Sequence, residues 1–500
     1  MTKLFTIGNI YTHLEGFTDE ELDLVEDVTS YTKEDLGNLK ASDSRKRFGA
    51  GGTWDGFFRF LRRPSSYPPS LPSGLRYKAF EALDKAGVPY EIQDDREAPG
   101  EPLFDFDFNI PLFDYQQEAS KALLSEGDCV LVAAPRAGKT RTGFAVIKEL
   151  GLPTIWIAPT SGIVKQTIRS AQEFFPKDQV VQVNSKNWRQ SMDKFLCVTT
   201  SAGMMKLPKE FWESREVLLV DEVHHFIDKG AWVKYLKKHT GHIYHRKGMS
   251  GTFFRSSGED VALHAFLSHV AYEIDTQKLM DKGRLTKTRV AHLELKGPKL
   301  ERDFDGYTGK GGLQWKGIVD YEPRNRAIVD LSVLFASRGR KVLILVASKP
   351  QGRALLQRIS DCVPSSPFGS GETVAFVSTD TSKKKLEEAF SAFRDGDTQV
   401  LIGTSLVGEG IDLPSADCLI YATGGKAAVS YVQALFRVCT AQEGKEESVI
   451  IDFVDKQHGI LLNHSRKRWE IASQYPVFDL QYLRHGDSVE AWLDKSGQAC

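Results

Sequence analysis

The sequence predicts an α/β protein in which two tandem parallel-sheet domains follow a small α+β N-terminal domain. From Gly127 onward, short runs of β-branched and apolar residues alternate with helical patterns. This alternation is typical of a parallel sheet with helices on both faces. The rhythm weakens through the Gly-, Lys- and Asp-rich segment 296–322 and then begins again. The chain length of 500 residues fits this plan, since domains average roughly 150 residues.

The expected strands form two groups, one for each sheet. The first group is Cys129–Ala134, Thr154–Ala158, Val180–Val183, Phe195–Thr199 and Val217–Val220, and the second is Val342–Val346, Thr373–Val377, Val400–Ile402, Leu419–Ala422 and Val449–Phe453. The Pro-, Gly- and acid-rich stretch Asp94–Asp107 resembles a linker. We therefore expect a small N-terminal domain with its linker at 1–105, α/β domains at 106–292 and 293–460, and a C-terminal helical extension at 461–500.

The composition excludes several classes of protein. Hydrophobic residues make up 41% of the chain and charged residues 26%, which is the balance of an ordinary globular protein. Lys and Arg number 65 against 66 Asp and Glu, so any nucleic-acid surface must be a local basic patch. No apolar run approaches the roughly 18 residues that span a bilayer, and the first residues do not resemble a secretory signal. Six scattered cysteines without a C-x-x-C pair predict a cytoplasmic protein without membrane partners.

A phosphate-binding loop stands between the first expected strand and the following helix. The string Ala133-Ala134-Pro135-Arg136-Ala137-Gly138-Lys139-Thr140 matches this pattern, with Ala in place of the first Gly. Small residues let backbone N–H groups surround phosphates at a helix N-terminus. Lys139 would reach the β and γ oxygens of ATP, and Thr140 would hold Mg²⁺. The alternative is a chance Gly-Lys-Thr string at a helix start.

A pair of carboxylates follows another buried strand. Val217–Val220 leads into Asp221-Glu222-Val223-His224, about 80 residues after the phosphate loop. Nucleotide sites lie at the carboxyl edge of such sheets. We expect Asp221 to position Mg²⁺ and Glu222 to orient the attacking water in phosphoryl transfer.

In this order the motifs resemble those of a superfamily 2 helicase of the DExH class. The resemblance implies two RecA-like domains that bind ATP and Mg²⁺ between them and hold a nucleic-acid strand. The segment Leu112–Ala119 resembles the family's adenine-reading motif, so Tyr115 and Gln116 are the expected base contacts. Phe113 stands where many relatives carry Arg.

Further motifs of the family occur downstream. The resemblance assigns nucleic-acid contacts to Pro159, Thr160, Thr200, Ser201 and Thr404, coupling between hydrolysis and movement to Ser250 and Thr252, and nucleotide contacts to Gly410 and Asp412.

The sixth motif departs from the family pattern. Gln433 and Arg437 stand at its catalytic positions, and Arg437 would be the arginine finger. Phe436 replaces a Gly, and Thr440 replaces the last Arg. Loss of a finger costs a factor of roughly 10³ to 10⁵ in turnover, so hydrolysis could be weak, could rely on Arg437 alone, or could use an Arg from elsewhere.

The N-terminal strings Thr53–Leu61 and Leu71–Leu75, together with Gln277–Gly283, resemble phage branch-migration helicases of the UvsW type. A phage origin would place the protein in the host cytoplasm. Basic and aromatic residues alternate near Phe58 and Phe60, which favours a half-buried strand. The expected nucleic-acid contacts here are Arg59, Arg62 and Arg63.

Two other basic clusters have a less definite role. The histidines His224, His225, His239, His242 and His245 lie among Lys237, Lys238, Arg246 and Lys247, and we interpret them as a solvated basic surface rather than a zinc site. Arg466-Lys467-Arg468-Trp469 could contact a duplex or only aid solubility.

Together these features predict an ATP-dependent DNA helicase or translocase that remodels branched DNA. One alternative is an ATP-gated nucleic-acid clamp or sensor with weak hydrolysis. Another is the motor subunit of a nuclease or restriction complex. The motifs do not distinguish DNA from RNA, and they do not specify the strand polarity or the preferred junction.

Overall fold

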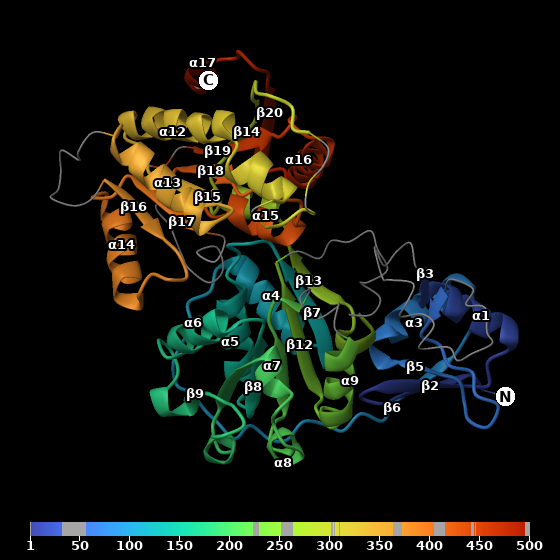
Figure 1. Cartoon of the computed structure of the whole chain (residues 1–500). Coiled ribbons are helices and arrows are strands. Elements are labelled where there is room, and N and C mark those ends of the chain that lie inside the picture. Colours follow the sequence, from blue (N-terminus) through green and yellow to red (C-terminus); the bar gives the residue numbers. More distant parts are fainter. Residues whose placement is uncertain are drawn as a thin grey trace. The chain divides into compact units, whose positions relative to one another are not determined.

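The computed structural model describes residues 2–32, 57–223, 230–251, 264–301, 304, 306–309, 311–363, 373–404, 416–441, 445 and 447–495. The chain divides into two compact units, Met1–Asp275 and Thr276–Cys500 (Figure 1). The first unit contains the N-terminal domain and a seven-stranded sheet, and the second contains another seven-stranded sheet. The expected α/β class with two tandem parallel sheets is confirmed.

The N-terminal domain is a small α+β domain with a four-stranded sheet in the order β5-β2-β1-β6. Its elements are β1 (Leu4–Ile7), β2 (Tyr11–Glu15), α1 (Asp19–Val28), β3 (Ser30–Thr32), β4 (Phe57–Arg59), β5 (Ser70–Pro72), η2 (Ser73–Leu75), α3 (Arg76–Lys85) and β6 (Glu91–Asp94). β3 and β4 form a separate antiparallel pair, in which Phe58 stacks on Tyr31 with ring centroids 5.1 Å apart. This confirms the expected strand at Phe58, and its aromatic side chain is half-buried.

The sheet of the first α/β domain has the order β13-β7-β12-β11-β8-β10-β9, and every neighbouring pair is parallel. Its strands are β7 (Asp128–Ala133), β8 (Thr154–Ala158), β9 (Val180–Gln182), β10 (Leu196–Thr200), β11 (Val217–Val220), β12 (His245–Ser250) and β13 (Val270–Ile274). Its helices are α4 (Asp114–Leu124), α5 (Lys139–Leu150), α6 (Ser161–Ala171), α7 (Ser201–Met204), α8 (Lys209–Glu213) and α9 (Gly230–His239), with the short turns η3 (Lys177–Gln179) and η4 (Arg189–Ser191).

Side chains of this sheet alternate between two helical layers, as the two-residue period of a strand requires. Val130 and Ile155 face a core that also contains Trp212 of α8 and Leu236 of α9. Trp156, the residue after Ile155, points to the other face and contacts Phe144 of α5, with ring centroids 5.3 Å apart. Helices on both faces bury all five residues of β8, which explains its continuous apolar run.

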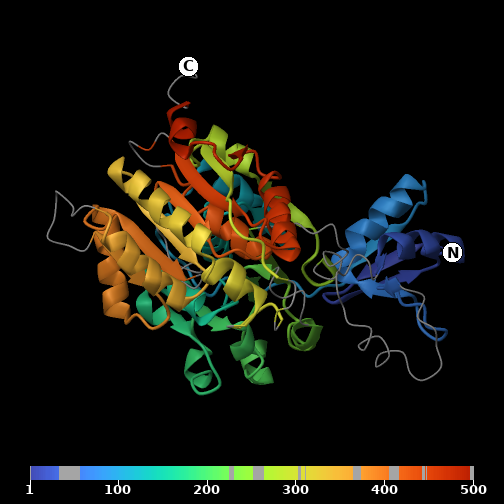
Figure 2. The same cartoon turned by 45° about the horizontal axis from the view of Figure 1, so that its top comes forward.

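The second unit repeats this arrangement with the order β16-β17-β15-β18-β19-β14-β20, again entirely parallel. Its elements are α11 (Thr276–Asp281), β14 (Thr288–Glu294), η6 (Trp315–Val319), α12 (Glu322–Ser337), β15 (Val342–Val346), α13 (Lys349–Ser360), β16 (Val374–Val377), α14 (Lys383–Asp395), β17 (Val400–Thr404), β18 (Cys418–Ala422), α15 (Ala428–Leu435), β19 (Ser448–Val454), α16 (Gly459–Ala472), β20 (Phe478–Leu483) and α17 (Val489–Asp494). Helices α12 and α13 lie side by side on this sheet in both views (Figures 1 and 2).

The ten strands expected from apolar runs are present, three with the expected bounds and the others with ends that differ by one or two residues. Four further strands, β12, β13, β14 and β20, were not expected. β14 belongs to the second sheet, so the expected domain boundary between residues 292 and 293 falls inside a strand. The first compact unit instead ends at Asp275. The expected helical extension at 461–500 likewise differs from the structure, since β20 pairs with β14 as an edge strand.

The expectation of a solvated basic surface around His245 is wrong for β12. His245, Arg246 and Lys247 are 6%, 1% and 1% exposed, because β12 lies in the sheet between β7 and β11. Lys247 donates to the carbonyl oxygens of Glu126 and Gly127. Burial also lowers the pKa of His245 to about 4. Within the described residues, no cluster of three or more His, Cys, Asp or Glu could hold a metal.

The expected linker is an aromatic strap on the first α/β domain. Phe106 packs edge-on against Phe175 and Phe195, with ring centroids 5.3 and 4.7 Å away. Phe104 contacts Phe195 and Phe108 contacts Phe175, whereas the intervening Asp side chains are exposed. The two-residue alternation of Phe with Asp therefore holds this connection against the domain without forming a strand.

Candidate nucleotide and nucleic-acid site

Three adjacent strands bring the nucleotide motifs to one edge of the first sheet. β12 pairs with β7 on one side and with β11 on the other, and all three strands are parallel. Their carboxyl ends lead into the phosphate loop after Ala133, into Gly251 and into Asp221. The strand order therefore places segments that are about 30 to 120 residues apart in sequence side by side, as the rule for parallel sheets predicts.

The phosphate loop has the backbone conformation that its sequence implies. Arg136 and Gly138 have φ angles of 74° and 80°, and Gly138 is the N-cap of α5. The amide of Gln116 donates to the carbonyl oxygen of Ala137 at 2.8 Å. A Cβ atom on Gly138 would lie 2.2 Å from Nε2 of Gln116. Gly138 is thus required twice, by its left-handed backbone and by the close approach of Gln116.

Gln116, the expected adenine contact, is 2% exposed and braces the loop. Its Oε1 also accepts a hydrogen bond from the backbone of Phe113 at 3.0 Å. Tyr115 is 1% exposed and stacks on Phe113 with ring centroids 5.7 Å apart. The first turn of α4 is therefore fixed against the phosphate loop, with the Phe113 ring at its surface.

Lys139 and Glu222 form the centre of the site. The Lys139 ammonium lies 3.6 Å from Oε1 of Glu222 and 3.5 Å from the carbonyl oxygen of Ala133. The backbone N–H of Gly251 donates to the other Glu222 oxygen at 3.3 Å. A Cβ on Gly251 would lie 2.9 Å from the Lys139 nitrogen, so this glycine keeps the space around the ammonium open. In the sequence, Gly251 stands between the coupling residues Ser250 and Thr252. Its contact with Glu222 could not be predicted from the sequence and is visible only in the structure.

Asp221 is a buried carboxylate beside this pair. Its side chain is 5% exposed, and one of its oxygens accepts the backbone N–H of Glu222 at 2.9 Å. Burial raises the pKa of Asp221, the Glu222 carboxylate raises it as well and Lys139 opposes the shift, and the resulting pKa is about 7. Glu222 has a φ of 47°, unusual for a non-glycine residue. A cation would relieve the crowding of these two carboxylates, and the Asp221 carboxylate and Thr140 hydroxyl are the hard oxygen donors that Mg²⁺ prefers.

The expected strand contacts of the first domain lie at the same edge, on the next strands. Pro159 and Thr160 follow β8, and Thr200 and Ser201 stand at the end of β10. The Thr160 hydroxyl caps α6 and the Thr200 hydroxyl caps α7, at 3.4 and 2.9 Å from their backbone donors. Because β11, β8 and β10 are neighbours in the sheet, these hydroxyls lie along the same edge as the nucleotide motifs.

The second unit holds the later motifs. Thr404 ends β17, is 7% exposed, and its hydroxyl finds no hydrogen-bond partner in the described part of the chain. Gln433 lies half-buried in α15, and Arg437 follows this helix at 8% exposure. The expected sites Thr252, Gly410 and Asp412 lie outside the described residues.

Phe436 has a structural explanation. Its ring is 1% exposed and packs edge-on against Tyr475 and Phe478, with centroids 5.5 and 5.3 Å away. β20 and the turn before it supply these two rings, so the added edge strand provides the apolar surroundings for a large side chain where relatives carry Gly. Thr440 forms an isolated bridge with Leu285.

The expected basic contacts outside the motifs separate into different roles. Arg59 pairs with Glu26 at 2.7 Å, and Arg63 pairs with Asp23 at 2.7 Å and with Glu26 at 3.2 Å. Arg62 instead lies over the Tyr11 ring, 5.1 Å from its centroid.

Arg468 differs from its neighbours in the C-terminal basic string. It is fully buried and holds both oxygens of Asp452 at 2.8 and 2.9 Å, so this residue has a structural role in the second domain. Arg466 and Lys467 are exposed, and their role stays open.

Comparison with known protein families assigns both α/β domains. Residues 109–255 match the family described as type III restriction enzyme, res subunit, and residues 324–441 match the helicase conserved C-terminal domain. Among the described residues, no helix combines the length and apolar character needed to cross a membrane.

Individual relatives are distant. DNA 3'-5' translocase XPB2 of Sulfurisphaera tokodaii is 21% identical over 431 residues, which are 80% of this chain and 96% of that protein. Rad25 of Haloarcula marismortui is 24% identical over 351 residues, and the match spans 52% of its length. The DUF1998 helicase MrfA bound to DNA has a similar fold, with a TM-score of 0.54 at 12% identity over 75% of this chain and 56% of that one. T4 UvsW is covered over 100% of its length and 97% of this chain, at 15% identity and a TM-score of 0.44.

Both domain models, in the order found in helicase motors, imply an ATP-dependent activity. The chain therefore belongs to the superfamily 2 helicases.

Proposed function

We propose that the protein is an ATP-dependent DNA helicase or translocase that remodels branched DNA. The observation that carries this proposal is the Lys139–Glu222 pair, held 3.6 Å apart at the carboxyl edge beside the phosphate loop. In a phosphoryl-transfer site this pair has complementary tasks, because the ammonium stabilises phosphate charge and the carboxylate orients the attacking water. The hydroxyls of Thr160 and Thr200 on the neighbouring strands fit contacts with strand phosphates.

The residues of the first domain divide the chemical work. Lys139 would leave Glu222 for the β and γ oxygens of bound ATP, and this exchange would free the Glu222 carboxylate to accept a proton from water. Asp221 and Thr140 would hold Mg²⁺, which neutralises charge on the phosphates when bound. Gln116 would keep the loop in place and contact the base. The assignment of Arg437 as the finger and of Gln433 as its neighbour in catalysis comes from the sixth motif.

The choice of DNA rests on the relatives. The name of XPB2 describes a DNA translocase, and MrfA has a structure bound to DNA. Dbp5, with a TM-score of 0.51, has a structure bound to RNA, so the fold alone does not select the polymer. The choice of branched DNA rests on the UvsW-type strings at Thr53–Leu61 and Gln277–Gly283. The second string begins with α11, at the start of unit 2.

The test is an ATPase assay on the full chain with single-stranded, duplex, forked and four-way DNA and with RNA. We expect the strongest stimulation by branched DNA and its loss in Lys139→Ala, Glu222→Ala and Arg437→Ala. Turnover that no nucleic acid stimulates, or that survives in Lys139→Ala, would refute the proposal.

Two other functions have specific support. The altered sixth motif favours an ATP-gated clamp, which would bind DNA tightly but hydrolyse ATP at a negligible rate. The match of 109–255 to a restriction-enzyme subunit favours the motor of a nuclease complex. Parallel measurement of fork binding, ATP turnover and strand separation identifies the clamp, and copurification of a DNA-cleaving partner identifies the complex.

A further inference from the structure

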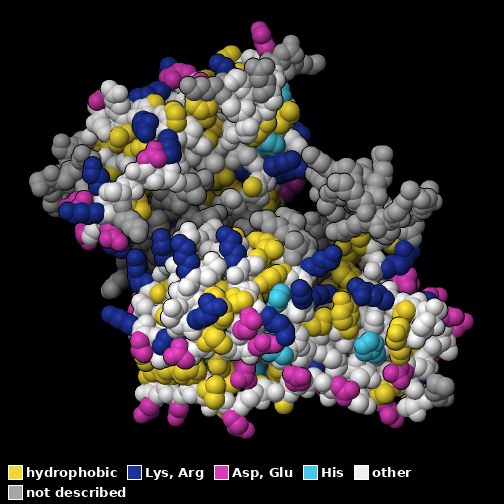
Figure 3. Space-filling model, turned by 60° about the horizontal axis from the view of Figure 1, so that its bottom comes forward, with side chains coloured by type: hydrophobic (Ala, Val, Ile, Leu, Met, Phe, Trp, Pro, Cys, Tyr) yellow, Lys and Arg dark blue, Asp and Glu magenta, His cyan; other side chains and the backbone are white. Residues whose placement is uncertain are grey.

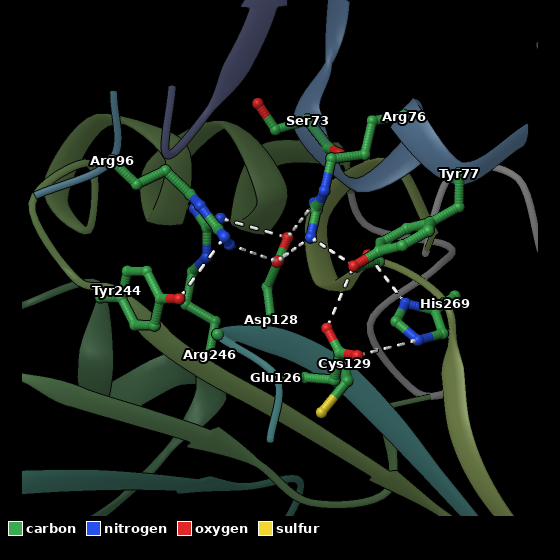
Figure 4. A network of polar contacts seen from close by, with 12 residues as sticks. Ser73, Arg76, Tyr77, Arg96, Glu126, Asp128, Cys129, Tyr244, Arg246 and His269 are labelled. Carbon is green, nitrogen blue, oxygen red and sulfur yellow. Dashed lines mark hydrogen bonds and ion pairs between the residues drawn. The ribbon is translucent and has the colours of Figure 1, made fainter. Parts of the chain in front are cut away.

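The N-terminal domain is joined to the first α/β domain by a buried charge cluster (Figure 4). Asp128, the first residue of β7, accepts hydrogen bonds from Arg76 of α3 at 2.6 and 2.9 Å and from Arg96 at 3.2 Å. Arg246 of β12 is the third guanidinium on this carboxylate, at 3.5 Å. The joint is also tight in its backbone, since a Cβ on Gly74 of η2 would lie 1.8 Å from the carbonyl oxygen of His264. These contacts fix the position of the N-terminal domain relative to the first α/β domain.

A second group of cations lies across the same joint. The Tyr11 ring of β2 has the Arg62 guanidinium 5.1 Å from its centroid and the Lys237 ammonium of α9 5.4 Å from it. Two of these residues come from the N-terminal domain and one from the motor domain. Within the described residues, neither Arg62 nor Lys237 has a carboxylate at ion-pair distance, whereas the adjacent Arg63 has two. Lys and Arg side chains gather where the two domains adjoin (Figure 3).

The charge balance at this place favours an anion. Burial and the charges of Arg62 and Arg246 together lower the pKa of Lys237 to about 8. The Asp128 carboxylate, which contacts Arg246, is already shared by three arginines. Like charges held together without a counterion repel each other, so a bound phosphate would relieve the repulsion and restore the full charge of Lys237.

The position of the group separates it from the predicted tracking strand. Arg246 and Asp128 stand at the amino ends of β12 and β7, and Lys237 lies in the last turns of α9, just before β12. Thr160 and Thr200 stand at the carboxyl ends of their strands. Because a strand of six residues is roughly 20 Å long, the two sets of contacts lie at opposite edges of one sheet. One nucleotide of a strand cannot touch both.

We propose that Arg62, Tyr11 and Lys237 form a second nucleic-acid site, which binds the phosphodiester backbone of the duplex arm of a branched substrate. The inference rests on the proposed function and names the part of the substrate that this site recognises. The positive charges of Arg62 and Lys237, which both lie over the Tyr11 ring, can bind one backbone phosphate. The Asp128 cluster keeps Arg62 and Tyr11 of the N-terminal domain close to Lys237 of the first α/β domain. Recognition of a duplex arm at one edge and of a strand at the other would give a preference for forks.

The experiment compares fork and single-strand binding by the full chain, using fluorescence anisotropy over a range of salt concentrations. We expect Lys237→Glu and Arg62→Ala to weaken binding of a labelled fork about tenfold or more, and to reduce the slope of log K against log salt by about one per lost contact. Binding of a single strand should change less than about twofold. Lys237→Arg should retain fork binding because it keeps the positive charge, whereas Lys237→Met, which keeps an unbranched apolar chain without the charge, should lose it.

Lys238→Glu is the matched control, because it makes the same charge change at the next, exposed position of α9. Equal losses in Lys237→Glu and Lys238→Glu would show a general field effect and overturn the site. Equal losses for fork and single strand would overturn the assignment to a duplex arm. ATPase stimulation of the wild type by single-stranded and by forked DNA is measured in parallel. Absence of stimulation by any of these nucleic acids refutes the proposed motor, whereas intact stimulation with unchanged fork binding in Lys237→Glu refutes only the second site.

Discussion

Arg76 and Asp128 form a fully buried ion pair in which one guanidinium nitrogen donates to each carboxylate oxygen, at 2.9 and 2.6 Å. Arg76 begins α3 of the N-terminal domain, and Asp128 begins β7, the strand that ends at the phosphate loop. One carboxylate therefore links the N-terminal domain to the strand that carries the nucleotide motif. Its three arginine neighbours lower the pKa of Asp128 despite a large opposing effect of burial.

Asp128→Ala should destabilise unit 1 strongly. Removal of this carboxylate leaves Arg76 and Arg246 buried without their counterion, and breaking a buried pair in this way costs about 3 to 5 kcal/mol. Urea denaturation measures the free energy of unfolding. Asp94→Ala is the control, because the Asp94 carboxylate is largely exposed and its loss should cost less than about 1 kcal/mol. Equal costs would show that the Asp128 cluster does not hold the joint.

Glu222→Gln should retain ATP binding and lose turnover. The amide keeps the size and the hydrogen bond from Gly251 but cannot accept a proton from water, and such catalysis contributes a factor of roughly 10² to 10⁴. Lys139→Ala should instead weaken ATP binding as well as hydrolysis. Nucleotide fluorescence and phosphate release separate the two effects. Glu216→Gln, at the opposite end of β11, should leave both unchanged, and equal losses at Glu216 would contradict the assignment.

Asp221→Asn should stabilise the metal-free protein at high pH while abolishing hydrolysis. Folding raises the pKa of Asp221 from 3.8 to about 7, so the folded state binds more protons than the unfolded state within this interval. Stability from this group is therefore present below about pH 4 and is lost as the pH rises to 7. The uncharged amide avoids the loss, which amounts to at most about 4 kcal/mol at about 1.4 kcal/mol per pKa unit.

The measurement is thermal unfolding of both proteins with a chelator present, from pH 5 to pH 8.5. The stability of Asp221→Asn relative to the wild type should increase with pH and level off above 7. A difference that does not change with pH would contradict the raised pKa.

Phe436→Gly should not restore activity although it restores the residue of the family motif. The ring packs against Tyr475 and Phe478, and truncation of a buried Phe to Ala costs about 3 to 5 kcal/mol, to which glycine adds backbone freedom. Denaturation and ATPase assays measure both outcomes. Phe436→Leu keeps much of the volume and should cost less. Faster hydrolysis in Phe436→Gly would show that the ring obstructs catalysis.

Local sequence determined the motifs and most strands of this protein. Val217–Val220 and Val342–Val346 were predicted to the residue, because both faces of a central parallel strand are covered and the strand is therefore an unbroken apolar run. The phosphate loop could also be predicted from the sequence. Gly138 acts through the conformation of its own backbone and Lys139 through its own charge, so neither depends on a residue far away in the chain.

Tertiary structure alone decided the positions whose partners are distant. β12 carries His245, Arg246 and Lys247, so its sequence indicates an exposed segment. β12 can nevertheless be buried, because its charged side chains find partners. Arg246 donates to Asp128, which is 118 residues away in sequence, and Lys247 donates to the carbonyl oxygen of Gly127. The roles of Arg468 and Phe436 stayed open for the same reason. The free energy of burying a charge or a ring depends on what lies opposite it, and no local pattern specifies that neighbour.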